Sequence, residues 1–300
     1  KLLRPRIDVS PMDGRSERGS KAAIRLSDLF HLRLTVDDKG GMLELMDALL
    51  EQGDPVRLCE IATEQLRIAV AIANEADFAV GPYDRLDDNL PTVERHDQNK
   101  FRDGVVFLVQ LLTDALKRVA DQDHQAARAI ADGWRALPSR IGTRLFLQAL
   151  RHPNLYSADE AAKAVLELSF DAFWKIRREL ILAMSERLRG ADPAITTAII
   201  DRILREAPTL YDGELETAGE QDWRPQVRDR NAWLRLTAMR RAKALTPAGS
   251  AELAAIATRH PFIAGDFDER DLFSSYSTGV RYVSGDPEPM KRINDPQKRI

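Results

Sequence analysis

Residues 193–208 read PAITTAIIDRILREAP, and residues 138–153 (PSRIGTRLFLQALRHP) and 247–261 (PAGSAELAAIATRHP) have the same form. Each stretch starts and ends with proline and carries apolar residues at helical spacing between the two. The opening prolines are 55 and 54 residues apart. A period of this size in a helical sequence is typical of stacked helical hairpins. We therefore predict an all-α fold, an α-solenoid of the HEAT, armadillo or TPR type with short irregular termini.

Two long helices are expected to precede the last two of these short ones, at residues 170–189 and 226–245. Leu182-Ala183-Met184 matches Thr237-Ala238-Met239 at an offset of 55 residues, which places both methionines in corresponding core layers. The three short helices, 138–152, 193–207 and 247–260, are then equivalent elements stacked in order. The alternative is a globular helical bundle in which the proline spacing is coincidental.

The rest of the chain is divided by its composition. Residues 1–20 hold prolines and glycines with little apolar periodicity, so we expect an extended arm or linker there. We expect an N-terminal helical region over 21–136, helical repeats of about 54 residues over 137–275, and a linker or the start of a further domain over 276–300. No run of alternating strand pattern is recognised between residues 21 and 270. Helix starts are marked by a capping residue followed by proline at Asp54, Asp192 and Thr246.

Composition narrows the function classes. The 44 basic and 47 acidic residues give a net charge of −3, which argues against a surface built throughout for nucleic acid or anionic membrane. A single cysteine excludes a disulfide framework and a cysteine-based zinc site. No apolar run is long enough to span a membrane and no signal peptide is visible. We expect a cytoplasmic protein with no cofactor, no metal site, no membrane partner and no catalytic activity in this segment.

Arginine and tryptophan supply the candidate binding residues. Arg177 projects from the apolar face that also carries Trp174, so it either packs its stem along the ring or serves as a recognition arginine in a groove. Residues 224–243 hold a basic cluster from which Arg228 and Arg235 are further candidates. At helical spacing these side chains scatter around the axis, which favours ion pairs between helices over a nucleic-acid strip. Binding of nucleic acid through this helix remains an alternative.

A helical enzyme is the other alternative. The polar segment 84–97 gathers groups able to act in acid–base chemistry or to bind a metal: Asp84, Asp87, Asp88, Glu94, His96 and Asp97. Clustered acids on a polar loop are more often just solvated. A site here requires His96 and two of the carboxylates to lie within a few ångströms of one another.

Residues of the third repeat resemble a known group of helical-repeat proteins. Residues 228–236 (RDRNAWLRL), His260-Pro261 and residues 269–273 (ERDLF) resemble the helical-repeat regions of large bacterial anti-phage defence proteins. These include STAND NTPases, which are bacterial relatives of NOD-like receptors, and SIR2-associated defence proteins. The likeness covers roughly residues 90–275 and implies a region that senses a phage component or scaffolds an assembly, with catalysis in other domains. The expected partner is a protein: a phage component, or other subunits or domains of the same assembly.

Overall fold

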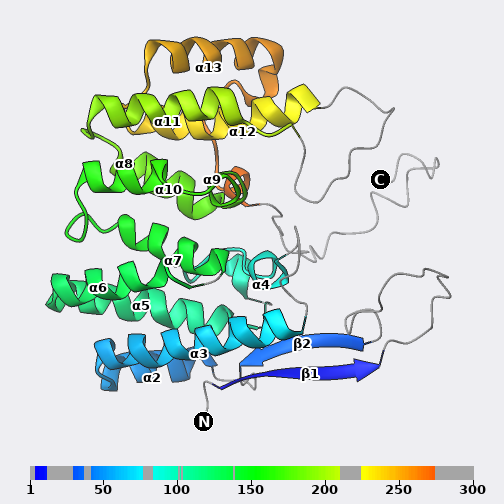
Figure 1. Cartoon of the computed structure of the whole chain (residues 1–300), viewed down its shortest axis with the longest axis vertical. Coiled ribbons are helices and arrows are strands. Elements are labelled where there is room, and N and C mark those ends of the chain that lie inside the picture. The colour runs from blue at the N-terminus through cyan, green and yellow to red at the C-terminus, as the bar shows by residue number, and fades with distance from the viewer. Residues whose placement is uncertain are drawn as a thin grey trace, which may run out of the picture.

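The computed structural model describes residues 4–11, 30–36, 42–76, 84–100, 102, 104–137, 139–209 and 224–273. Over these residues the chain is mostly helical, and its helices lie in successive layers along the longest axis of the molecule (Figure 1). The longer helices are α2 (Met42–Gln52), α3 (Pro55–Glu75), α5 (Val106–Gln122), α6 (His124–Trp134), α7 (Arg140–Leu150), α8 (Ala158–Leu166), α9 (Phe170–Lys175), α10 (Arg178–Arg187), α11 (Pro193–Glu206), α12 (Arg224–Arg241) and α13 (Pro247–Arg259). The short ones are α4 (Arg85–Asp88), η1 (Asp97–Asn99), η2 (Pro261–Ile263) and η3 (Arg270–Leu272).

A two-stranded antiparallel sheet corrects the all-α prediction. Strand β1 (Pro5–Pro11) pairs with β2 (Phe30–Val36), with Pro5 opposite Val36, and β1 packs against α3. The arm expected at residues 1–20 therefore contains a paired strand. In β2 apolar residues alternate with polar ones from Phe30 to Val36, which is the period of a strand with one covered face. The pattern was present in the sequence and was missed.

Proline-marked helix starts are confirmed at all three positions. The side chains of Asp54, Asp192 and Thr246 accept backbone N–H groups in the first turns of α3, α11 and α13. Each of these helices has proline in its first turn, where no intrahelical donor is lost. The apolar stripe expected along α3 is buried as well, and the thiol of Cys59 within it has its pKa raised to about 12 by burial.

The single helix expected over 170–189 is two helices. Helix α9 ends at Lys175, Ile176 is extended, and α10 starts at Arg178. Neither proline nor glycine lies in this stretch, so the break has no local cause in the sequence. Its cause is a contact from α12, which is described below.

Helix packing places α7 differently from the prediction. Helix α7 packs against α10 and α10 against α12, whereas α8 packs against α11 and α11 against α13. The short helices that lie next to one another are therefore α8, α11 and α13, and α7 belongs with α10 and α12. Helix α7, which follows Pro138, and helix α11, which begins at Pro193, therefore lie in different rows, and the equivalence predicted for helices 138–152 and 193–207 is wrong. Met184 on α10 and Met239 on α12 are both fully buried.

Candidate functional site: the arginine face of α10 and α12

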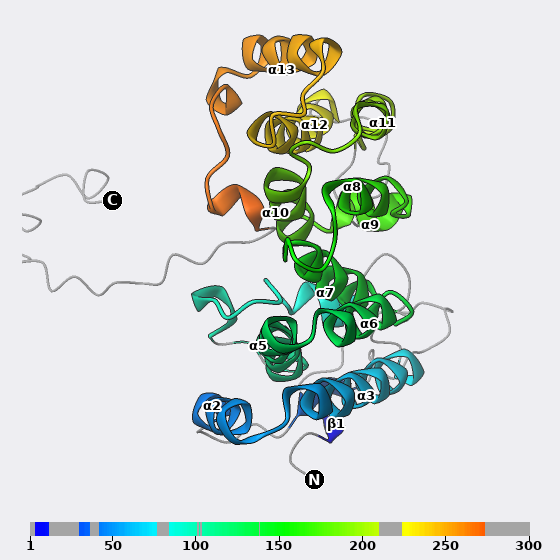
Figure 2. The same ribbon diagram turned by 90° about the vertical axis from the view of Figure 1, so that its left-hand side faces the viewer.

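Residues 261–273, which we call the strap, lie along α12 and continue onto the start of α10. In Figure 2 the strap is the orange segment that passes beside α12 and then α10. Its contacts follow α12 in reverse order, from Arg241 near residue 266 to Arg230 near residue 271. The side chains that hold it form what we call the arginine face: Arg177, Arg178, Arg230, Trp233, Arg240 and Arg241.

The C-terminal end of α12 holds the first half of the strap. Arg241 donates from Nε to both oxygens of Asp266 at 3.0 and 2.9 Å and from Nη2 to the Phe267 carbonyl at 2.7 Å. Its guanidinium also lies 3.6 Å from the centre of the Phe267 ring. The Gly265 carbonyl accepts from Arg240 at 3.2 Å and from Trp233 at 3.4 Å. Side chain and backbone of the strap are thus both bound.

The start of α10 holds the other end. Arg177 donates to the Phe273 carbonyl at 2.9 Å, and the guanidinium of Arg178 lies 4.9 Å from the centre of the Phe273 ring. Arg178 also lies 3.6 Å from Glu269, whose carboxylate meets the Nε2 atom of His96 at 2.9 Å. The His96 contact joins the strap to segment 84–100, which is 173 residues away from Glu269 in the chain.

Apolar anchors seat the strap between these polar contacts. Ile263, Phe267, Leu272 and Phe273 are all buried, while the intervening acidic residues are mostly exposed. A gap of only about 10 Å³ remains where Asp271 meets Arg177 and the first half of α12. Such a gap holds one water molecule at most. Around Asp271 the seam between strap and arginine face is therefore nearly closed.

Segment 84–100 does not form the acid–base site that was considered for it. Arg144 is buried and bonds to Glu179 at 3.0 Å, to Asp87 at 2.8 Å and to the Leu90 carbonyl at 2.6 Å. Burial alone would raise the pKa of Asp87, but the charges of Arg144 and Arg140 outweigh it and hold this pKa below its usual range. These carboxylates are structural partners of arginines.

The remaining acids of the segment are not gathered around His96 either. Glu94 pairs with Arg151 at 3.0 Å. Burial raises the pKa of Glu94, but the charges of Arg151 and Arg178 together with hydrogen bonds to Glu94 outweigh it and lower this pKa. The nearest charged partner of His96 that the structure gives is Glu269, from outside the segment. Asp84 caps α4, Asp97 lies in η1, and Asp88 pairs with Arg140 at 3.8 Å. No three metal-ligating side chains come together within the described ranges.

Arg235 and Trp174, two of the candidate partner-binding residues, are buried. Arg235 donates from Nε and Nη2 to the Phe173 carbonyl at 3.1 and 2.6 Å and from Nη2 to the Trp174 carbonyl at 3.0 Å. Its guanidinium lies 4.3 Å from the Trp174 ring. Burial, then the charges of Arg177 and Arg202, lower the pKa of Arg235 well below its usual value. Both side chains face inward, so their assignment as surface anchors is replaced by a structural role.

Those contacts explain the break between α9 and α10. The last carbonyls of a helix lack intrahelical partners. At the end of α9 the carbonyls of Phe173 and Trp174 are satisfied from α12 by Arg235 instead of by continuing the helix.

The other two candidates, Arg228 and Arg177, are partly exposed. Arg228 pairs with Asp229 at 3.0 Å and with Glu252 at 3.1 Å. Asp229, whose side chain is 3% exposed, also meets Arg259 at 2.7 Å and His260 at 3.2 Å. In this part of the basic cluster the arginines form ion pairs between α12 and α13. Arg177 instead belongs to the arginine face. A partner-binding role for these two stays a prediction.

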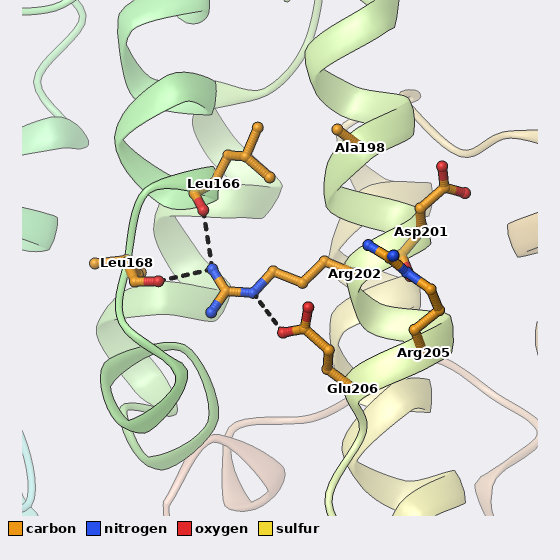
Figure 3. A pocket seen from close by; sticks show the side chains of 7 residues that line it. All are labelled: Leu166, Leu168, Ala198, Asp201, Arg202, Arg205 and Glu206. Carbon is orange, nitrogen blue, oxygen red and sulfur yellow. Dashed lines mark hydrogen bonds and ion pairs between the residues drawn. The ribbon is translucent and has the colours of Figure 1, made fainter.

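An open pocket of about 380 Å³ lies between α11 and the connection from α8 to α9. Figure 3 shows Arg202 crossing it, with its guanidinium directed at the carbonyls of Leu166 and Leu168 and at Glu206. Arg205 and Asp201 lie at its exposed edge. The charges of the lining balance, and the arginine is engaged by backbone, so this pocket offers no acid–base pair.

Comparisons with known proteins give a relative but no family. No family model matches the chain, and no solved structure is similar to it. The chain is similar to the uncharacterized protein y4cA of Sinorhizobium fredii (strain NBRC 101917 / NGR234), with 30% identity over 272 residues. The alignment covers 90% of this chain and 23% of that relative, so the chain spans less than a quarter of its length. Because the relative is itself uncharacterized, the similarity assigns no activity.

Sequence reasoning did not single out the strap as a bound segment. Its signal was four acidic residues within 266–273, interleaved with Phe267, Leu272 and Phe273 and following an arginine-rich helix.

Among the helices that the structure describes, none is long and apolar enough to cross a membrane.

Proposed function

We propose that the chain is a non-catalytic interaction region, an α-solenoid that recognises or scaffolds a protein partner in the cytoplasm. The observation that carries the proposal is the packing of helices in two neighbouring rows. Helices α7, α10 and α12 form one row and α8, α11 and α13 the other. Helix α5 packs against α6 and α12 against α13, and the one- and five-residue connections within these pairs favour antiparallel helical hairpins. Repeated hairpins present an extended surface, which suits binding of another macromolecule.

Interlayer arginines support the same proposal. Arg202 on α11 bonds to carbonyls at the end of α8, Arg187 on α10 bonds to the Tyr156 carbonyl before α8, and Arg228 on α12 bonds to the Leu204 carbonyl of α11. Each links one layer to the layer before it. A stack joined by contacts between neighbouring layers keeps its shape along its length, as a scaffold requires.

The setting of the proposal is bacterial anti-phage defence. It rests on the resemblance of residues 228–236 and 269–273 to helical-repeat regions of STAND NTPases and SIR2-associated defence proteins. A relative more than four times the length of the aligned region agrees with a part acting inside a large protein. Any NTPase or effector activity would belong to other domains of that protein.

The test uses the complete gene in a bacterial host. We expect the wild-type gene to lower the plating efficiency of at least one phage in a panel. Met184→Asp, which breaks the row of α7, α10 and α12, should abolish protection. Arg67→Glu, an exposed change on α3, should leave it intact. Crosslinking in infected cells should join this region to a second protein. A gene that restricts no phage and whose crosslinks stay within the chain would refute the proposal.

A further inference from the structure

The strap has a composition that matches the surface beneath it. Its last eight residues carry four carboxylates and two phenylalanines. The arginine face offers five guanidinium groups and one indole N–H. Acidic residues pair with arginine, and phenylalanine rings lie under guanidinium groups at Arg241 and Arg178. Charge and ring contacts alternate along the strap.

Backbone recognition is part of the match. Three donors of the arginine face bind strap carbonyls: Trp233 and Arg240 at Gly265, and Arg177 at Phe273. Arg241 adds the Phe267 carbonyl. Donors that meet several backbone carbonyls of one segment fit a peptide.

The strap is held less firmly than segment 84–100, although both lie against the same row of helices. Its ion pairs at the end of α12 involve Arg240, Arg241 and Asp266, whose side chains are 42%, 38% and 51% exposed. At its other end Glu269, 52% exposed, pairs with the less exposed Arg178. Segment 84–100 is instead fixed by Arg144 and Glu179, whose side chains are 7% and 2% exposed. Exposed ion pairs contribute little and are screened by salt. The hold on the strap therefore depends mainly on its buried apolar side chains, Phe267 and Phe273 among them, and less on these ion pairs.

We propose that the arginine face is a docking surface for an acidic, phenylalanine-bearing segment of a partner protein, and that the strap occupies this surface in the free chain. The inference rests on the proposed function, for which it names the chemistry of the partner. Binding in trans then requires displacement of the strap, which lowers the apparent affinity by the fraction of chains in which the surface is open.

The experiment measures binding of a fluorescent peptide with the sequence of residues 261–273, PFIAGDFDERDLF, to the full chain. We expect weak binding to the wild type and about tenfold tighter binding to the strap variant Phe267→Ala/Phe273→Ala. Adding Arg241→Glu to the strap variant should lower the affinity about tenfold, because it reverses the charge that holds Asp266. Adding Arg205→Glu, a matched change outside the face, should not.

A second strap variant covers a folding failure of the first. Asp266→Asn/Asp271→Asn removes one exposed and one half-buried charge from the strap and should also tighten peptide binding. A peptide with alanine in place of Phe267 and Phe273 should not bind. In wild-type chain, amide hydrogens of residues 265–273 should exchange faster than those of residues 86–99.

Three results would overturn the proposal. One is the absence of peptide binding to either folded strap variant. Another is exchange of the strap only at the rate of α10, which would make it an inseparable part of the core. The third is a dimer of the strap variants on gel filtration, which would assign the surface to a second copy of the chain. If phage restriction persists in any of these cases, the proposed function stands without this inference.

Discussion

Replacing Arg235 by methionine should destabilise the protein, although it removes a buried positive charge. The guanidinium is 1% exposed and no acidic partner faces it among the described residues. Its neighbours include the positively charged Arg177 and Arg202. Its compensation comes from the carbonyls at the end of α9 and from two aromatic rings. The substitution therefore asks whether those contacts outweigh the cost of burying the charge.

The magnitude follows from the acceptors left behind. Methionine leaves two buried carbonyls, those of Phe173 and Trp174, without the arginine donor. A buried polar group that loses its partner costs about 1–3 kcal/mol, which gives about 2–6 kcal/mol for the pair. Relief of the burial cost offsets part of this, since replacing buried charges by apolar residues is often favourable. We expect a net loss of about 2–4 kcal/mol, or about 5–10 °C in Tm.

Thermal unfolding followed by circular dichroism tests this, with the exposed Arg189→Met as the control expected to change stability by less than about 0.5 kcal/mol. Arg235→Lys keeps the charge but not the planar fork, and should fall between wild type and Arg235→Met. Hydrogen exchange should locate the damage at residues 173–178. A methionine variant as stable as wild type would mean that capping of α9 does not hold the break in place, and the reasoning would fail.

Three further changes can be read from the same unfolding curves. Asp87→Asn should lower Tm at pH 7, and the difference from wild type should shrink below about pH 4: the pKa of Asp87 is depressed in the fold, so its stabilisation is present above the unfolded value and is lost as pH falls. An unchanged difference at pH 3 would contradict this. Met184→Asp buries an unpaired charge and should cost about 4 kcal/mol, against less than about 1.5 kcal/mol for Met184→Leu. Gly142→Ala should destabilise by about 1–3 kcal/mol because the new methyl group meets the Trp134 carbonyl at the end of α6 and the Leu137 side chain, whereas Gly133→Ala, with open space around it, should stabilise by about 0.5–1 kcal/mol. Equal effects of the two alanines would refute the packing argument.

Local features of the fold were predictable because their causes are local. The stripe along α3 follows from helical spacing, and the starts of α3, α11 and α13 follow from a capping side chain beside proline. Strand β2 could also have been predicted, because apolar and polar residues alternate from Phe30 to Val36. A helix was expected there because the sequence on its C-terminal side has helical spacing. The break at Ile176 was beyond reach, since its cause is an arginine about 60 residues further along the chain.

The candidate site could be predicted only in part, because its contacts also join residues that are distant in the sequence. The basic cluster of residues 224–243 was expected to serve ion pairs between helices, and Arg228 does so with Glu252. Sequence spacing could not tell which arginines bind helix ends and which bind the strap, because both kinds lie on α12. Arg235 and Arg241 differ in what accepts their hydrogen bonds, and only the packed structure shows that.

That difference in acceptors is what separates structure from function among these arginines. Every layer of a helical stack leaves carbonyls at helix ends, and Arg202, Arg228 and Arg235 reach back to satisfy them. Because these acceptors are backbone carbonyls of helices, they cannot separate from the arginines unless a helix unfolds. The acceptors of Arg240 and Arg241 lie between η2 and η3, outside any helix, and their ion pairs are exposed, so the proposed docking of another segment of the same chemistry need not unfold a long helix. Exchange of partners is possible only where the acceptor can be released, and within the described residues this argument selects the arginine face over the interlayer arginines as the place to look for a partner.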